Sequence, residues 1–124
     1  MPKILIAEDE CELRELISFT LEKSGYQVVE AADGAEAFQL ARRDPPDLVL
    51  LDVRMPRMTG YDTCAAMRAD KKLKDIPVIF LSAKGQDSEI QRGLQAGAQE
   101  YLVKPFSPEL LVKRIKVLLA REKK

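Results

Sequence analysis

Residues 48–60 have the sequence LVLLDVRMPRMTG, which begins with a continuously apolar run of four residues and continues into Asp52. Two other continuous apolar runs are found at Ile4–Ala7 and at Val78–Leu81. Short, unbroken apolar runs are typical of parallel strands that are covered on both faces. The three runs therefore predict the central strands of a parallel sheet.

Two further runs are shorter and have polar neighbours. Val28–Val29 lies between Gln27 and Glu30, and Tyr101–Val103 follows Glu100. Polar flanking residues indicate partial exposure, so we expect these two strands at the edges of the sheet.

The segments between the runs carry apolar residues at helical spacing. Gly25, Pro45-Pro46 and Gly97 are typical residues at helix ends, and Ser107-Pro108 is typical of a helix start. The apolar markers are Leu13, Leu16, Ile17 and Leu21; Phe38 and Ala41; Tyr61, Cys64 and Ala65; Ile90 and Leu94; and Leu111, Ile115, Leu118 and Leu119.

Strands and helices therefore alternate five times along the chain. With the first, third and fourth strands in the centre, the pattern predicts an α/β fold: a doubly wound, five-stranded parallel sheet of order 2-1-3-4-5, flanked by five helices. We find no linker or internal repeat and expect residues 1–124 to form a single domain.

Composition excludes several classes of function. The chain has 124 residues, 20 basic and 20 acidic side chains, and no histidine, which rules out a histidine-based triad and a histidine zinc site. The formal net charge is zero, with the first half acidic and the second half basic, so we expect no direct binding to nucleic acid. The apolar runs are too short to cross a membrane. We expect Cys11 and Cys64 to be reduced residues in or near the core of a cytoplasmic protein.

Reactive side chains follow four of the predicted strands. Glu8–Glu10 follows the first strand, Asp52 the third, Ser82 the fourth and Lys104 the fifth. Each alone is commonly a solvated loop residue or a cap, but the carboxyl ends of parallel strands meet at one edge, where ligands bind. Clustered carboxylates without histidine favour a hard cation, Mg²⁺ before Ca²⁺. With a lysine opposite, they indicate a site for a phosphoryl group.

Four segments carry a family resemblance that spans about residues 3–119. They resemble, in order and spacing, the receiver domains of two-component response regulators, which have the CheY-like or flavodoxin-like fold. The segments are Glu8-Asp9, Asp52–Gly60, Ser82-Ala83-Lys84 and Tyr101–Phe106.

The resemblance implies a phosphoryl acceptor and a metal site. Asp52 corresponds to the aspartate that accepts a phosphoryl group from a sensor histidine kinase or a histidine phosphotransfer protein. Asp9 and Asp52 correspond to direct ligands of Mg²⁺, which Mn²⁺ can replace. Glu8 corresponds to a ligand acting through water, and Arg54 to one that contributes its backbone carbonyl. Many members have Asp where this chain has Glu8.

The resemblance also implies a switch. Ser82 corresponds to the hydroxyl residue that follows the phosphoryl oxygens, Lys104 to the lysine that pairs with Asp52 and then with the phosphoryl group, and Tyr101 to the aromatic residue that turns inward. The Lys104-Pro105 bond is expected to be cis.

The same resemblance implies a signalling domain rather than an enzyme. Its only chemistry would be phosphotransfer to its own aspartate and slow self-dephosphorylation. The phosphorylated form would control an output domain or a partner. Contacts with an effector or a second copy are expected on the fourth helix, the fifth strand and the fifth helix.

Three alternatives remain open at this point. An aspartate-nucleophile phosphatase would need a second aspartate two residues after Asp52, where this chain has Arg54. A flavin-binding protein would need a phosphate-binding loop after the first strand, where Glu8–Glu10 would repel the ligand. An interaction module without phosphorylation is the third. No nucleotide-binding P-loop motif is present.

Overall fold

The computed structural model describes residues 1–55, 57–82 and 87–122 of the chain. Pro56, Ala83 and Lys84, which belong to the motif segments, lie outside the described residues.

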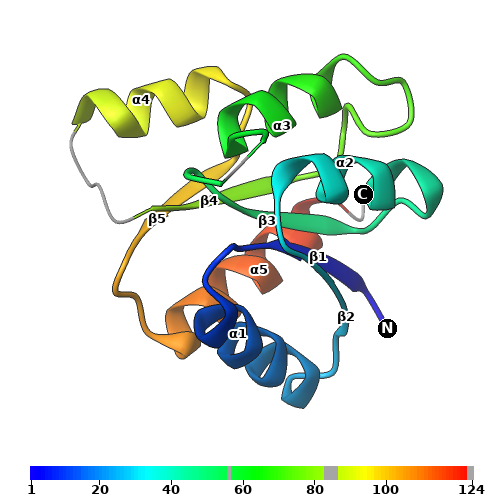
Figure 1. The fold of residues 1–124 in the computed structure, drawn as a ribbon. Coiled ribbons are helices and arrows are strands. Elements are labelled where there is room, and N and C mark those ends of the chain that lie inside the picture. Colours follow the sequence, from blue (N-terminus) through cyan, green and yellow to red (C-terminus); the bar gives the residue numbers. More distant parts are fainter. Residues whose placement is uncertain (56, 83–86, 123–124) are drawn as a thin grey trace.

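The described residues form the predicted alternation of strands and helices (Figure 1). The strands are all parallel, in the order β2-β1-β3-β4-β5. The predicted doubly wound architecture and strand order are therefore confirmed. The strands are β1 (Lys3–Ala7), β2 (Gln27–Ala31), β3 (Leu48–Asp52), β4 (Val78–Ser82) and β5 (Glu100–Val103); the helices are α1 (Cys11–Lys23), α2 (Gly34–Arg43), α3 (Gly60–Arg68), α4 (Asp87–Gln95) and α5 (Pro108–Glu122).

At their carboxyl ends, β3 and β4 extend one residue past their apolar runs. Asp52 pairs with Leu81 at the end of β3, and Ser82 pairs with Val103 at the end of β4. Both side chains are buried. Two of the predicted site residues are thus held by the sheet itself rather than by the loops that follow it.

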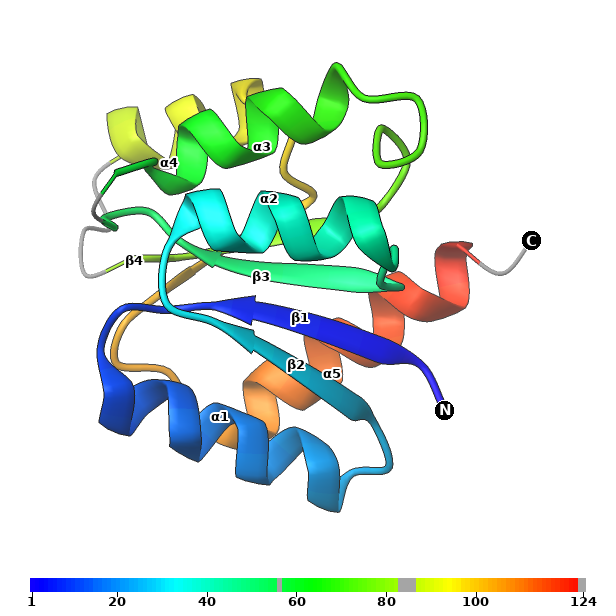
Figure 2. The same ribbon diagram turned by 45° about the vertical axis from the view of Figure 1, so that its right-hand side comes forward.

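The sheet lies between two layers of helices (Figure 2), and each of its faces carries its own hydrophobic cluster. On one face α1 and α5 cover the sheet, with Ile17 and Ile115 packing in the same cluster as Ile4, Leu50 and other strand residues. On the other face lie α2, α3 and α4 (Figure 1). The alternation of side chains along each central strand supplies both cores, which is why those runs are continuously apolar.

Helix boundaries follow the predicted signals. The side-chain oxygen of Ser107 accepts a hydrogen bond from the backbone amide of Leu110 at 3.1 Å, and α5 begins at Pro108. The prolines at 45 and 46 follow the end of α2, and Gly25 follows the end of α1. Within the described ranges, no helix combines the length and apolar character needed to cross a bilayer.

The apolar residues marked in the sequence are not all buried, and the expectation that Cys11 lies in or near the core was wrong. Leu16 is 53% exposed, because α1 turns Ile17 and Leu21 toward the sheet and successive helical residues lie about 100° apart. On α4, Leu94 is exposed while the neighbouring Gly93 is buried. Cys11 is exposed in the first turn of α1, unlike the buried Cys64.

Candidate functional site

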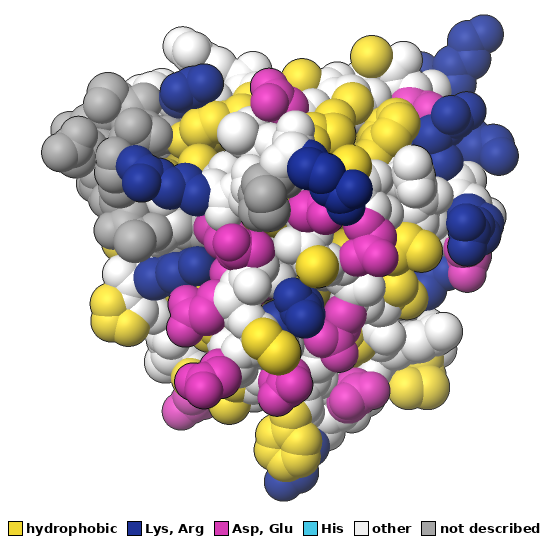
Figure 3. All heavy atoms as spheres, in the orientation of Figure 1, with side chains coloured by type: hydrophobic (Ala, Val, Ile, Leu, Met, Phe, Trp, Pro, Cys, Tyr) yellow, Lys and Arg dark blue, Asp and Glu magenta, His cyan; other side chains and the backbone are white. Residues whose placement is uncertain are grey.

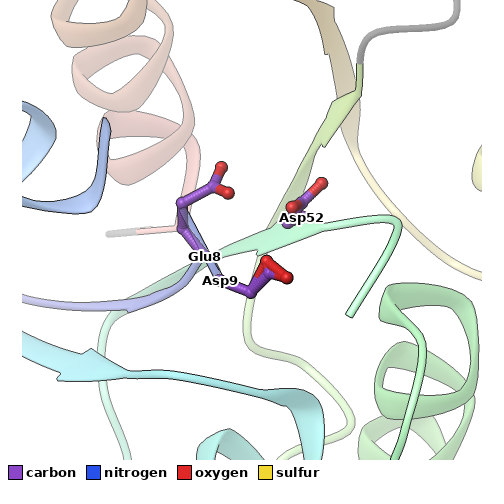
Figure 4. A group of neighbouring side chains, drawn as sticks. All are labelled: Glu8, Asp9 and Asp52. Carbon is purple, nitrogen blue, oxygen red and sulfur yellow. The ribbon is translucent and has the colours of Figure 1, made fainter. Parts of the chain in front are cut away.

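Three carboxylates converge where β1 and β3 end (Figure 4). Glu8, Asp9 and Asp52 each offer an oxygen within 4.8 Å of the others. Glu8 and Asp52 are buried and Asp9 is exposed. The cluster therefore extends from the buried interior to the surface, where a charged ligand can enter from solvent.

The sheet register brings the carboxylates together. Ala7 of β1 is paired with Leu51 of β3, so the next residues, Glu8 and Asp52, emerge side by side. The amide of Glu8 donates to the carbonyl of Ala31 at 3.3 Å, which prolongs the pairing of β1 with β2 by one residue. Two neighbouring strands therefore fix the spacing of the acidic residues.

Lys104 brings the positive charge from the other side of the site. Its backbone amide donates to the carbonyl of Ser82 at 2.7 Å, and the following Lys104-Pro105 bond is cis, as expected. Its Nζ lies 2.8 Å from Glu8 Oε1 and 3.6 Å from Asp52 Oδ1. The expected partner of Lys104 was Asp52, but the shorter ion pair is with Glu8.

The environment shifts the proton affinity of Asp52 and Lys104. Burial and the neighbouring Glu8 carboxylate raise the pKa of Asp52 to about 7, against the opposing effects of Lys104 and of the Arg54 amide. Burial by itself opposes the charge on Lys104, but Glu8 and Asp52 outweigh it and raise the pKa of the ammonium. Without a further cation, the site holds more negative charge than Lys104 compensates.

The backbone that follows β3 contacts the Asp52 carboxylate. The amide of Arg54 lies 3.4 Å from Asp52 Oδ1, and the exposed side chain of Arg54 is directed away from the core. Before and after it, the amide of Val53 donates to Leu81 and the amide of Gly60 donates to Val53, each at 3.0 Å. Both ends of the loop are therefore anchored to the sheet.

The remaining predicted residues, Ser82 and Tyr101, lie on β4 and β5. Ser82 is buried at the carboxyl end of β4, on the edge where Asp52 ends β3. The Tyr101 ring is half-buried and packs edge-to-face on Phe80, which packs edge-to-face on Tyr61. The three rings connect β5, β4 and α3.

Sequence reasoning missed two arginine contacts beside the site. Arg14 donates to the backbone carbonyl of Glu8 at 2.6 Å and pairs with Glu30 at 3.1 Å, so it ties α1 and β2 to the residue after β1. Arg57, in the loop after β3, pairs with Asp33. Charge alone could not single out these two among 20 basic residues.

The surface carries the charge asymmetry of the sequence. In Figure 3, acidic side chains gather in the middle and lower part of this face, with a few basic side chains among them and others toward the edges.

Known proteins resemble this chain in both sequence and fold. Residues 4–116 match the response regulator receiver domain. The chain belongs to this family. It is 40% identical over 121 residues to the DNA-binding dual master transcriptional regulator RpaA of Synechocystis sp., a match that covers 98% of this chain and 50% of RpaA. The receiver domain thus spans about half the length of the curated relatives it matches.

Solved receiver structures superpose closely on this one. Chemotaxis response regulator CheY4 of Vibrio cholerae is 38% identical with a TM-score of 0.90, covering 94% of this chain and 98% of CheY4. The receiver domain of sensor histidine kinase PA1611 from Pseudomonas aeruginosa, solved with a magnesium ion in its active-site cleft, is 32% identical with a TM-score of 0.90, covering 96% and 98%. The present chain is a receiver domain of the two-component response regulator type.

Proposed function

We propose that this receiver domain accepts a phosphoryl group on Asp52, in a Mg²⁺-dependent reaction, from a sensor histidine kinase or a histidine phosphotransfer protein. The observation that supports this is the convergence of Asp52 with Glu8, Asp9 and Lys104 at the carboxyl edge of the sheet. The acceptor carboxylate thus belongs to a cluster that attracts a cation, and a lysine that attracts an anion lies beside it.

The donor set suits a small, hard cation. Carboxylate oxygens within 4.8 Å of one another are ligands for Mg²⁺ or Mn²⁺, and an ion there offsets the charge that Lys104 leaves uncompensated. Asp9 and Asp52 would bind it directly, Glu8 through water, and Arg54 through its backbone carbonyl. The magnesium in the related PA1611 receiver supports this assignment.

In the proposed transfer, a carboxylate oxygen of Asp52 attacks the phosphorus in line with the bond to the donor imidazole. The new O–P bond forms as the N–P bond breaks, and the imidazole nitrogen keeps the electron pair. The bound cation supplies electrostatic stabilisation of the transferring oxygens. Lys104 would contact the same oxygens, because its Nζ lies 3.6 Å from Asp52 Oδ1.

The same site accounts for a signalling role rather than turnover of an external substrate. Attack of water on the phosphorus returns inorganic phosphate and the Asp52 carboxylate, which is the slow self-dephosphorylation we propose. Cys11 and Cys64 are free thiols, which suits the reducing cytoplasm, and we propose that location for the domain.

The conformational change caused by phosphorylation would spread from the site through Ser82, Lys104 and Tyr101. A phosphoryl group adds about −1.5 to −2 charge. Ser82 and Lys104 can bind its oxygens in the phosphorylated form and have no such contact in the unphosphorylated form, so phosphorylation shifts the balance between conformations. Lys104 follows β5, and Tyr101 lies on β5 against Phe80. We therefore propose that α4, β5 and α5 form the surface that contacts an output domain, an effector or a second copy of the chain.

Acetyl phosphate with Mg²⁺ tests the proposal. Wild-type protein should gain the mass of one phosphoryl group, located on Asp52 by peptide mapping, and EDTA should prevent the gain. Asp52→Asn should show none, while Asp75→Asn, which changes an exposed carboxylate outside the cluster, should react like wild type. Incorporation that persists in Asp52→Asn, or that proceeds in EDTA, would contradict the assignment, and no incorporation in wild type would favour an interaction module.

A further inference from the structure

Arg57 has an unusual backbone conformation for its residue type. Its φ is +68°, in the left-handed region that glycine and asparagine enter most readily. It is the non-glycine residue with positive φ in the described part of the chain. A long side chain at such a position implies that other contacts hold the backbone there.

Asp33 provides that contact. The Nε of Arg57 donates to Asp33 Oδ2 at 3.1 Å, and the Nη2 of Arg57 donates to the same oxygen. The other oxygen of Asp33 accepts from the amide of Glu36 at 2.9 Å and so caps α2. Asp33 is only 7% exposed, and the Glu36 amide and the Arg57 guanidinium both lower its pKa. The Glu36 amide therefore orients the Asp33 carboxylate independently of Arg57.

The first residue of α2, Gly34, is also in close contact with this loop. A Cβ on Gly34 would lie 2.3 Å from the backbone carbonyl oxygen of Met58 and 2.2 Å from the side-chain oxygen of Thr63. Real side chains do not reach such distances, so the helix approaches the loop as closely as its backbone allows. The loop that follows Asp52 is therefore held against α2 both by charge and by contact.

This loop is also the one that borders the phosphoryl acceptor. The Arg54 amide is 3.4 Å from Asp52 Oδ1, and the Gly60 amide is bonded to Val53 at 3.0 Å. Arg57 lies between these two anchored positions, and its side chain reaches across to α2. We therefore expect a change in the Arg57 backbone to displace the Arg54 peptide group, three residues earlier in the chain.

We propose that Asp33 and Arg57 are a positioning pair, which holds the loop after β3 so that its backbone groups reach the cation and the phosphoryl group at Asp52. This inference rests on the proposed function. Neither side chain touches the reacting atoms; they act through the backbone of Arg54 and its neighbours. Mutation of a residue that orients a metal ligand commonly lowers metal affinity about 10- to 100-fold, and we expect this more distant pair to lie at the low end of that range.

Three single variants test the pair. Asp33→Asn keeps an oxygen to cap α2 and leaves the loop sequence unchanged. Arg57→Asn suits a left-handed residue and removes the guanidinium. Arg57→Lys retains the charge with a single donor group. Arg42→Ala is the matched control, because Arg42 pairs with Asp70 at 3.0 Å at the opposite end of α2.

The Mg²⁺ dissociation constant, from isothermal titration calorimetry, and the rate of phosphorylation by acetyl phosphate are measured for each variant. We expect both asparagine variants to bind Mg²⁺ about tenfold more weakly, with Arg57→Lys in between and Arg42→Ala unchanged. The double variant should be no weaker than either single one. Thermal melts in EDTA check that all variants are folded.

Three results would overturn the positioning role: wild-type Mg²⁺ affinity in both asparagine variants, a loss confined to Arg57→Asn, or losses that add fully in the double variant. If wild type itself binds no Mg²⁺ and accepts no phosphoryl group, the proposed function fails instead. The wild-type measurement therefore separates the two failures.

Discussion

The ammonium of Lys104 lies closer to Glu8 than to Asp52, at 2.8 Å from one carboxylate and 3.6 Å from the other. Glu8 follows β1 and Lys104 follows β5, two strands that are not neighbours in the sheet. Glu8 is only 1% exposed. Because an uncompensated charge is costly in a buried position, Lys104 stabilises the fold as well as the site.

Replacing Lys104 by methionine should therefore destabilise the metal-free protein. The side chain keeps similar bulk, but Glu8 and Asp52 lose their common cation. We expect the free energy of unfolding in EDTA at pH 8 to fall by about 2 to 4 kcal/mol. Mg²⁺ should restore part of this loss. Chemical denaturation with EDTA and with Mg²⁺ measures both effects.

The matched control is Lys113→Met, at an exposed position on α5. It should change stability by less than about 0.5 kcal/mol, as surface substitutions usually do. Glu8→Gln combined with Lys104→Met should recover most of the loss, since it removes the stranded charge. A Lys104→Met protein as stable in EDTA as the Lys113→Met protein would show that the ion pair contributes nothing.

The raised pKa of Asp52 predicts a pH dependence of stability without metal. Asp52 has a pKa of about 7 in the folded protein and an ordinary value of 3.8 when unfolded. Between these values the folded state binds a proton that the unfolded state has released, so this group lowers stability as pH rises toward 7. Asp52→Asn should melt higher than wild type in EDTA at pH 8, and the difference should shrink at pH 5.

Mg²⁺ binding should release a proton for the same reason. A cation at Asp52 requires the ionised carboxylate, so the affinity should weaken below pH 7, by at most about tenfold per pH unit. Calorimetric titrations at pH 6 in two buffers of different ionisation enthalpy measure the proton count. A count near zero at pH 6, equal to that at pH 8.5, would show that Asp52 is already ionised.

The architecture could be predicted because it depends on periodicity. The apolar runs at Ile4–Ala7, Leu48–Leu51 and Val78–Leu81 mark the central strands whatever their neighbours are. Exposure was harder to predict. Leu16 and Phe19 lie on an exposed side of α1, because the position of α5 decides which stripe of α1 is covered.

The membership of the acidic cluster could also be predicted, since parallel strands end at one edge. The pairing within it could not. Lys104 reaches Glu8 past Asp52 because of side-chain length and direction, which strand order does not specify. Likewise, nothing in the sequence near Arg57 indicates that its partner is Asp33, 24 residues earlier in the chain.

Gly93 should be essential for the packing of α4 on the sheet. A Cβ at this position would lie 2.8 Å from ring carbons of both Phe80 and Tyr101. Although alanine favours a helix, Gly93→Ala must displace these rings, and we expect a loss of about 1 to 3 kcal/mol. Denaturation and the aromatic NMR signals of Tyr101 measure it. Gln91→Ala, at an exposed position of α4, is the control and should leave both unchanged.

We expect the main structural changes on phosphorylation to occur around Tyr101 and α4. With a beryllofluoride mimic of the phosphoryl group and Mg²⁺, we expect the largest changes in hydrogen exchange within residues 82–108, because Ser82 and Lys104 can bond directly to the new charge. Asp52→Asn under the same conditions is the control. Changes confined to residues 11–45 would contradict the proposed output surface of α4, β5 and α5.

Asp9 should be at once a metal ligand and a source of repulsion. Its carboxylate lies within 4.8 Å of Glu8 and Asp52, and its exposure leaves it the most accessible of the three to an ion from solvent. Exchanging it for asparagine removes one of the like charges, each pair of which costs about 1 to 4 kcal/mol near 4 Å. Asp9→Asn should therefore melt higher than wild type in EDTA, by an amount at the low end of this range because water screens Asp9.

The Asp9→Asn protein should also gain little stability from Mg²⁺ and lose phosphorylation. Wild type with a dissociation constant near 1 mM would gain about 1.4 kcal/mol in its free energy of unfolding in about 10 mM Mg²⁺. Thermal melts of both proteins in EDTA and in Mg²⁺ decide this. A variant that is less stable in EDTA, or that responds to Mg²⁺ as fully as wild type, would show that Asp9 is not a ligand.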